Sequence, residues 1–307
     1  MKLESNDFEG AIVDFTQAIS LNAAFDSAFC KRGLAHYSLH QNEEAVEDYS
    51  MAIVLNPRYA AAYNNRGLAR SELKEYAQAL ADCAKALELE PSYIGVYVNM
   101  GLIHEDQGKY KEAIQNYTLA LKKDPLNEDA WHNRAAAKFK AGDMQGAIED
   151  CDKAIQLFPQ DPELYFNRAY ALFEMGKYPS SILDYNKAIQ LQPNWAEAYS
   201  NRGFAKYYMP DLQGSLSDFD KAIELDPTKE KAYFGRGEIQ FDRKNYVKAL
   251  SEYTRALTLD PTFAEAFLSR ANTYWEMGKK EEACLDWNKA MGLGDKEAKK
   301  NHAKNCR

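Results

Sequence analysis

Small and apolar residues recur along the chain in two alternating helical patterns that repeat every 34 residues. In the copy at residues 60–93, the first pattern places Tyr63 and Gly67 four residues apart on one helix face. The second runs from Tyr76 to Leu87, with apolar positions three or four residues apart. A proline near the end of the copy stops the second helix, because proline has no amide hydrogen to donate. The unit is therefore predicted to be a hairpin of two antiparallel helices.

Eight copies of this unit follow one another without an insertion. When each copy is numbered from its first residue, position 27 is always alanine, positions 8 and 20 are always small, and position 4 is always a large ring. Close-packed interiors do not tolerate extra volume, so the small columns mark where helices approach closely. A hairpin alone cannot bury its apolar face, and stacking against neighbours is expected. The copies begin at Asp26, Ala60, Ile94, Glu128, Pro162, Ala196, Glu230 and Ala264.

These columns resemble the tetratricopeptide repeat, a helical hairpin of this period, over roughly residues 1–297. The resemblance implies an all-α protein, an α-solenoid of antiparallel helical hairpins wound as a right-handed superhelix. It would hold eight full 34-residue repeats and an N-terminal partial repeat. We expect a single array over residues 1–307, in which residues 1–25 are mostly the second helix of a partial repeat. Residues 26–297 would hold the eight repeats, and residues 298–307 would form a polar C-terminal cap or tail.

The first residues, MKLESN, supply only the end of a first helix. Solenoids normally carry polar caps, and nothing in the sequence covers the surface that this partial repeat exposes. We therefore expect the chain to be a fragment of a longer protein, or one cut within a repeat. Self-association at the incomplete N-terminal edge is the alternative. Farther along, Met209-Pro210-Asp211 replaces the usual glycine turn, which predicts an altered corner in that hairpin.

The chain is acidic, with a net charge of −8 and a pI near 5.3. It lacks the basic stripe that neutralises phosphates, so no nucleic acid partner is expected. No apolar run reaches the length of a membrane span, and the N-terminus does not resemble a signal peptide. We expect no membrane association and a cytoplasmic location. Metal spacing, catalytic triads and phosphate loops are missing from the sequence, so we expect no enzymatic activity, no cofactor and no metal.

Five cysteines are scattered along the chain without metal spacing. Cys83, Cys151 and Cys284 occupy columns that hold apolar residues in other copies, so we expect buried free thiols there. Cys30 lies at position 5, on the side expected to face a groove, and Cys306 lies in the tail. No disulfide is expected, which favours a reducing compartment.

Position 7 is arginine and position 23 is acidic in seven of the eight copies. The remaining copy has Met100 and Asn116 at these positions, so both charges disappear together. We interpret the two columns as ion pairs that join the helices of each hairpin; the alternative is a row of arginines that grips an anionic ligand. The expected pairs are Arg32–Asp48, Arg66–Asp82, Arg134–Asp150, Arg168–Asp184, Arg202–Asp218, Arg236–Glu252 and Arg270–Asp286.

The resemblance assigns extended peptides to one side of the first helices, at positions 2, 5, 6, 9, 12 and 13. Position 6 carries five consecutive asparagines, whose amides can both donate to and accept from a peptide backbone. This column resembles the asparagine ladder in the repeat domain of O-linked N-acetylglucosamine transferase; a local structural role is the alternative. The asparagines are Asn65, Asn99, Asn133, Asn167 and Asn201, and the column then changes to Gly235.

In the C-terminal half the same side carries aromatic rings fringed by acidic residues, the expected anatomy of a peptide site. Five amide contacts of about 0.5–1.5 kcal/mol each barely reach the roughly 8 kcal/mol of a micromolar complex, so ring burial must supply the remainder. The predicted peptide-binding rings are Phe166, Tyr170, Phe173, Phe204, Tyr207, Phe234 and Phe241.

These patterns predict a protein–protein interaction scaffold that binds an extended peptide segment of a partner, with apolar and basic residues, in a concave groove. The alternative is the non-catalytic, substrate-recruiting repeat domain of a larger enzyme such as a glycosyltransferase. A clamp for the acidic C-terminal tails of heat-shock chaperones is not expected. Position 5 has no lysine in any copy, and Asn272 is the only asparagine at position 9.

Overall fold

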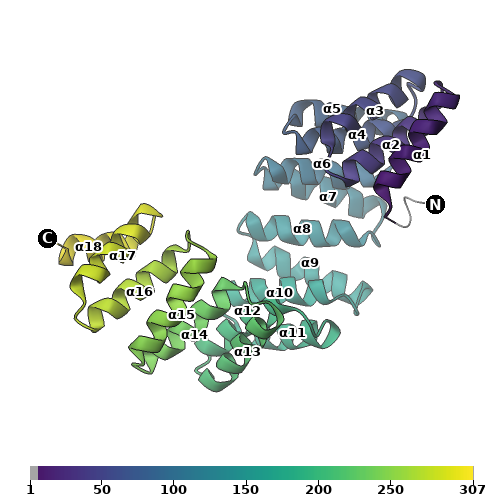
Figure 1. Ribbon diagram of the computed structural model, residues 1–307. Coiled ribbons are helices and arrows are strands. Elements are labelled where there is room, and N and C mark those ends of the chain that lie inside the picture. Colours follow the sequence, from purple (N-terminus) through teal and green to yellow (C-terminus); the bar gives the residue numbers. More distant parts are fainter. Residues whose placement is uncertain (1–5, 307) are drawn as a thin grey trace. The chain divides into compact units, whose positions relative to one another are not determined.

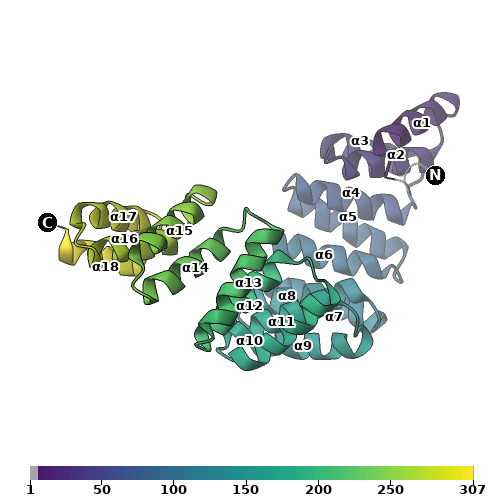
Figure 2. The ribbon, with the colours of Figure 1, turned by 60° about the horizontal axis from the view of Figure 1, so that its bottom comes forward.

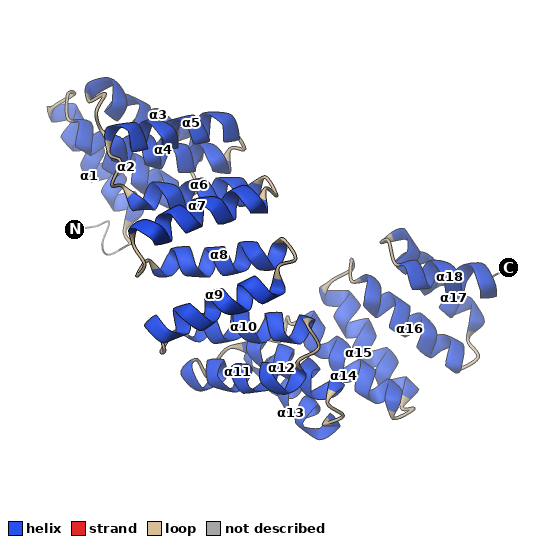
Figure 3. Ribbon diagram, turned by 180° about the vertical axis from the view of Figure 1, so that it is seen from behind, coloured by secondary structure: helices blue, strands red, loops and turns tan. Residues whose placement is uncertain are grey.

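The computed structural model describes residues 6–306, and every regular element in this range is an α-helix (Figure 3). The all-α prediction is therefore confirmed. Most of the MKLESN segment, predicted as the end of a first helix, lies outside the described residues. The eight predicted repeat starts are the first residues of α2, α4, α6, α8, α10, α12, α14 and α16.

The chain forms two compact units, one ending at Leu157 and one beginning at Phe158 (Figure 1). The helices of the N-terminal unit are α1 (Phe8–Leu21), α2 (Asp26–Ser38), α3 (Asn42–Leu55), α4 (Ala60–Glu72), α5 (Tyr76–Leu89), α6 (Ile94–Asp106), α7 (Tyr110–Lys123), α8 (Glu128–Lys140) and α9 (Met144–Leu157). The helices of the C-terminal unit are α10 (Pro162–Glu174), α11 (Tyr178–Leu191), α12 (Ala196–Tyr208), α13 (Leu212–Leu225), α14 (Glu230–Asp242), α15 (Tyr246–Leu259), α16 (Ala264–Glu276), α17 (Lys280–Gly292) and α18 (Lys296–Asn305).

Within each unit the helices pack as consecutive hairpins (Figure 2). The second helix of one hairpin contacts the first helix of the next, and the first helices of successive hairpins also contact one another. Helix α1 packs on α2, and α18 packs on α17. The predicted stack of hairpins is confirmed. A single array over residues 1–307 and a right-handed superhelix stay predictions.

The small columns lie where the two helices of a hairpin meet. Two serines replace alanine at position 20, and their hydroxyls show which positions face each other. Ser181 donates to the carbonyl of Ala169 at 2.8 Å, and Ser215 donates to that of Gly203 at 2.7 Å, so position 20 faces position 8. The alanines of position 27 are fully buried in every copy: Ala52, Ala86, Ala120, Ala154, Ala188, Ala222, Ala256 and Ala290.

The corner of each hairpin holds one residue in the left-handed region, at position 15 of the repeat. Glycine occupies this position in four copies with φ between +70° and +85°, because glycine has no Cβ to oppose that conformation. Pro210 occupies it in the sixth copy and has no amide hydrogen for the bond to the carbonyl three residues earlier that the other corners form. The predicted altered corner at Met209-Pro210-Asp211 is confirmed.

All seven predicted arginine–acid pairs form. In each pair the arginine Nε and Nη2 donate to the two carboxylate oxygens, with N···O distances of 2.6–3.2 Å. The guanidinium also lies over the ring at position 4 of its own helix, 4.8–5.7 Å from the ring centroid. Most of these arginines use Nη1 to reach the preceding repeat, where the acceptors are Thr16, Ser50, Thr118, Asn186, Asp220 and Thr254.

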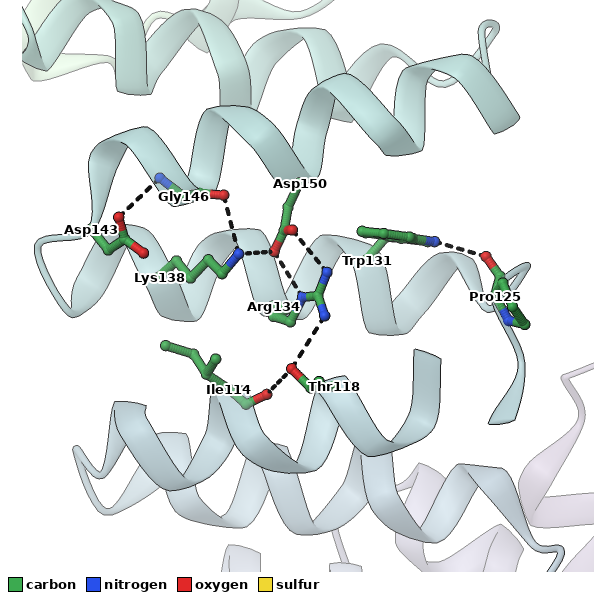
Figure 4. A network of polar contacts seen from close by, with 9 residues as sticks. All are labelled: Ile114, Thr118, Pro125, Trp131, Arg134, Lys138, Asp143, Gly146 and Asp150. Carbon is green, nitrogen blue, oxygen red and sulfur yellow. Dashed lines mark hydrogen bonds and ion pairs between the residues drawn. The ribbon is translucent and has the colours of Figure 1, made fainter. Parts of the chain in front are cut away.

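Figure 4 shows the pair in which the acid is most deeply buried. Asp150 accepts from Arg134 through both oxygens at 2.8 Å, and from the Nζ of Lys138 at 2.8 Å. Arg134 also donates to the hydroxyl of Thr118 at 3.2 Å, which joins α8 to α7. The arginine N–H groups donate to acceptors within the protein. This confirms the interpretation as ion pairs between the helices of a hairpin, rather than a row of arginines that binds an anionic ligand.

Residues 298–305 of the predicted polar cap or tail form most of helix α18, which begins at Lys296. The side chain of Asp295 caps this helix by accepting from the amide of Ala298 at 2.6 Å. Ala298 is fully buried in a cluster with Trp287 of α17, whereas four lysines and a histidine make the rest of the helix polar.

The predictions of a free thiol at Cys284 and of no disulfide in the chain are wrong. Cys284 and Cys306 form a disulfide with their Cα atoms 5.7 Å apart. The cause is tertiary: α18 returns along α17 and brings the tail beside a residue 22 positions earlier. The expectation of a reducing compartment, which rested on the lack of disulfides, loses that support.

The other three cysteines are buried free thiols. This confirms the prediction for Cys83 and Cys151, and burial raises the pKa of the Cys83 thiol to about 12. Cys30 was expected on the groove side but is buried, because position 5 packs between neighbouring first helices.

Breaking the disulfide is expected to loosen the end of the C-terminal unit. A cross-link that closes a loop of this length stabilises a fold by about 2–4 kcal/mol, mainly by restricting the unfolded chain. Cys306→Ser should therefore speed hydrogen exchange in α18 and lower the free energy of unfolding of the adjoining repeat. Adding reductant to the wild-type protein should reproduce this change and should leave Cys306→Ser unaffected. Alkylation of five thiols, rather than three, in the unreduced denatured protein would contradict the disulfide.

Candidate functional site

The asparagine column occupies the first helices of both units, and all five side chains are half-buried. In the N-terminal unit, part of the column has a local structural role. Asn99 donates to Oδ1 of Asn64 at 2.8 Å, and Asn64 donates to Oδ1 of Asn65 at 3.2 Å. By contrast, the amides of Asn133 and Asn167 form no hydrogen bond with any residue in the described range 6–306. These two amides are open to a ligand.

The column ends at Gly235 for a steric reason. A Cβ at Gly235 would lie 2.2 Å from the ring of Phe219, and one at Gly203 would lie 2.7 Å from the same ring. Phe219 comes from α13, and its fully buried ring fills the space between the first helices on either side of it. An asparagine at position 235 would displace this ring, so the sequence carries glycine.

Position 5 was predicted to line the groove. This is wrong in the four copies where the residue at this position is small and buried. Phe166 and Phe234 are half-buried at this position. Phe166 stacks on Trp195 with the ring centroids 4.3 Å apart, and Phe234 lies 5.0 Å from Phe263. Both rings therefore pack between repeats, and their contact with a peptide stays a prediction. The buried members of the column are Cys30, Asn64, Val98 and Ser200.

Four of the predicted residues line one cavity of about 210 Å³ in the C-terminal unit. Tyr170 and Phe173 come from α10, and Asn201 and Phe204 come from α12. The fringing acid Glu174 also lines it, together with Tyr208 and Lys231. Tyr208 was not among the predicted residues, although an aromatic residue in the otherwise polar position 13 was a usable signal.

Ring contacts hold one wall of the cavity in place. Tyr208 stacks on Tyr178 with centroids 5.1 Å apart and an interplanar angle of 13°. Phe173 lies 5.5 Å from Tyr178 and 5.8 Å from Tyr208. On the other side, Phe204 meets the buried ring of Phe219 edge to face at 4.9 Å. Such pairs fix ring orientation beyond what burial of area alone achieves, so the cavity is preformed.

The two remaining predicted rings lie outside the cavity lining. Tyr207 on α12 donates its hydroxyl to Oδ2 of Asp242 on α14 at 2.7 Å, which links neighbouring first helices. Phe241 packs 5.7 Å from Tyr246 of its own hairpin. Both rings are half-buried, so they continue the aromatic surface toward the C-terminus.

Acidic groups dominate the electrostatics around the cavity. Burial, together with the charges of Glu174 and Glu197, raises the pKa of Tyr170. Burial also raises the pKa of Glu238, which accepts from the hydroxyl of Tyr253 at 2.6 Å. Within the described part of the chain, Glu174 and Glu197 have no cationic partner. Lys231 is the one basic residue in the lining.

A larger hollow of about 500 Å³ lies against α12 and α13, but its charged groups are already used. Arg202 is paired with Asp218, and Lys221 is paired with Glu224 at 2.6 Å. The cavity beside Glu174, which has no cationic partner within residues 6–306, is therefore the better candidate site. As to membranes, none of the helices in residues 6–306 combines the length and apolar composition that a bilayer crossing requires.

Profiles of one repeat family match the sequence along much of its length. A profile described as TPR repeat matches residues 37–74, 169–209 and 237–278. Three profiles described as tetratricopeptide repeat match residues 98–162, 60–93 and 151–182. Comparison with curated proteins finds none that matches this sequence.

Solved structures with the same fold include a tetratricopeptide repeat protein from Parabacteroides merdae, with a TM-score of 0.68 and 20% identity over 81% of this chain and 99% of that chain. The APC/C hetero-tetramer Cut9–Hcn1 gives a TM-score of 0.65 at 14% identity, over 96% of this chain and 58% of that chain. YrrB, described as a TPR protein with an unusual peptide-binding site, has a TM-score of 0.50 and 27% identity over 61% of this chain and 96% of that chain. With helical hairpins, family profiles and structural matches in agreement, the chain is a tetratricopeptide repeat protein.

Proposed function

We propose that this protein is an interaction scaffold that holds an extended peptide segment of a partner along the first helices of its repeats. The observation that carries the proposal is the preformed aromatic cavity between α10, α12 and α14, which Asn201 also lines. Tetratricopeptide repeat proteins are generally interaction scaffolds. The similarity to YrrB, whose description names a peptide-binding site, supports the same kind of ligand.

Two kinds of contact would share the binding free energy. In the C-terminal unit, an open amide such as that of Asn167 can pair with a backbone group of an extended chain regardless of its side chains. The cavity then selects one side chain, because each CH2 group that it buries against the rings contributes about 0.8 kcal/mol. An asparagine ladder like that of a glycosyltransferase repeat domain, and the lack of catalytic activity, cofactor and metal, stay predictions from the sequence.

The proposal is tested by screening an array of linear decapeptides and titrating the best binder by fluorescence anisotropy. We expect Asn167→Ala to weaken binding about fivefold, as for one hydrogen bond of ~1 kcal/mol. The control is Leu183→Ala, which alters an exposed side chain on the second helix α11 and should leave affinity unchanged. Unchanged affinity in Asn167→Ala would remove this asparagine from the site, and failure of every peptide to bind would contradict the scaffold itself.

A further inference from the structure

The cavity lined by Tyr170, Phe173, Phe204 and Tyr208 combines ring faces with an uncompensated carboxylate, Glu174. We propose that this cavity receives a positively charged side chain, lysine or arginine, of the bound peptide. Its ammonium or guanidinium group would lie against the ring faces and beside Glu174. The inference rests on the proposed peptide-binding function and names the residue class that the peptide must present.

The first support is the chemistry of the lining. A cation within about 6 Å of an aromatic centroid is attracted by the negative face of the ring, and the attraction grows when water is excluded. The same repeats already use this contact internally, since Arg202 lies 5.2 Å from the ring centroid of Tyr199 and Arg236 lies 5.4 Å from that of Tyr233. In the described range, no side-chain cation lies over the rings of Phe173 or Tyr208, so neither ring already holds a cation of the protein itself.

The second support is charge complementarity. Acidic residues outnumber basic ones along the groove positions of the C-terminal unit, where Lys231 stands alone among them. Glu238 and Asp242 accept hydrogen bonds from tyrosine hydroxyls of the protein, whereas Glu174 has no such donor within residues 6–306. A cationic side chain would neutralise that charge. The acids at these positions are Glu163, Glu174, Glu197, Glu238, Asp242, Glu265 and Glu276.

A neutral apolar side chain fits this lining less well. It would cover Glu174 and the amide of Asn201 without returning a hydrogen bond, and burying an unpaired carboxylate is costly. A cation instead replaces the water around Glu174 with an ion pair while its aliphatic stem contacts the rings. Glu174 on α10 and Lys231 on α14 carry opposite charges, so they have opposite effects on one bound cation. Glu174 attracts it and Lys231 repels it.

The test uses the full chain and the best-binding decapeptide from the array, made with lysine, arginine or methionine at its most sensitive position. We expect the cationic peptides to bind about tenfold or more tightly than the methionine peptide, in the range for a partly desolvated cation over rings. Glu174→Gln should weaken the lysine peptide severalfold and leave the methionine peptide unchanged. Lys231→Met should strengthen the lysine peptide. Glu224→Gln, on the exposed face of α13, is the matched control and should change neither.

The outcomes separate the two proposals. Peptides that bind with no preference for lysine or arginine would overturn the inference and leave the scaffold function intact. The same holds if Glu174→Gln weakens the lysine and methionine peptides equally. If no peptide binds at all, the proposed function fails first. Opposite effects of Glu174→Gln and Lys231→Met, confined to the cationic peptides, would establish the inference.

Discussion

Asp150→Asn is expected to lower the free energy of unfolding of the N-terminal unit by about 3–5 kcal/mol, the usual cost of breaking a buried ion pair. Asp150 is 1% exposed and accepts from both Arg134 and Lys138. Asparagine has nearly the same shape, so packing is preserved while two half-buried cations lose their anion. Urea unfolding followed by circular dichroism measures the change, and hydrogen exchange in α8 and α9 locates it.

Two companion variants test the cause. Asp220 also binds an arginine, Arg236, at 2.9 Å, but its side chain is 61% exposed. Asp220→Asn should therefore cost less than about 1 kcal/mol, as exposed pairs do. Adding Arg134→Met to Asp150→Asn imitates the charge-free pair that the chain carries at Met100 and Asn116 and should recover part of the loss. Equal, small effects at Asp150 and Asp220 would show that burial does not strengthen the pair.

Trp287→Ala is expected to destabilise the C-terminal repeat by about 3–5 kcal/mol, the range for removing a large buried ring. Trp287 is 2% exposed and packs with four fully buried alanines of α16–α18 and with Trp275, 5.4 Å away. Its Nε1 donates to Oδ1 of Asn272 at 2.9 Å, and this acceptor would lose its partner. The loss should appear as unfolding of α16, α17 and α18 at lower urea concentration.

The control lies on the same helix. Leu285 is 68% exposed, so Leu285→Ala should change the free energy of unfolding by no more than about 0.5 kcal/mol. Trp287→Phe retains most of the buried area, and Phe219 shows that phenylalanine fits this position of the repeat. Its cost should be about 1–3 kcal/mol, from the unsatisfied acceptor on Asn272. If Trp287→Ala behaves like Leu285→Ala, the ring is not part of a cooperative core.

The repeat start at each first helix could be predicted to the residue because packing constraints recur at every copy. A small residue is needed at the same position wherever two helices approach closely, so Ala222 and Ala256 both mark position 27 of their repeats. The arginine–acid pairs were equally accessible, because Met100 and Asn116 lose both charges in one copy. Pairing within a hairpin spans only 16 residues, and the repeat fixes its geometry.

The candidate site was predicted only in part. Tyr170, Phe173, Asn201 and Phe204 were assigned to one surface, and the structure brings them together in one cavity. Phe166 and Phe234 carry the same type of side chain but turn toward neighbouring repeats. The helical periodicity indicates which face of the helix a residue occupies, but it does not indicate how far the ring extends toward the next hairpin. Side-chain direction at the edge of a face was therefore undetermined.

The hairpin, its period, the close-packed columns and the ion pairs could be predicted from the residues alone, because they depend on contacts that every copy repeats. The features that occur once depend on how the folded helices pack. The ring of Phe219 excludes a side chain at Gly235, the return of α18 joins Cys284 to Cys306, and α10, α12 and α14 together enclose a cavity. Each depends on a single arrangement of side chains from different helices, and a one-copy contact leaves no periodic trace in the sequence.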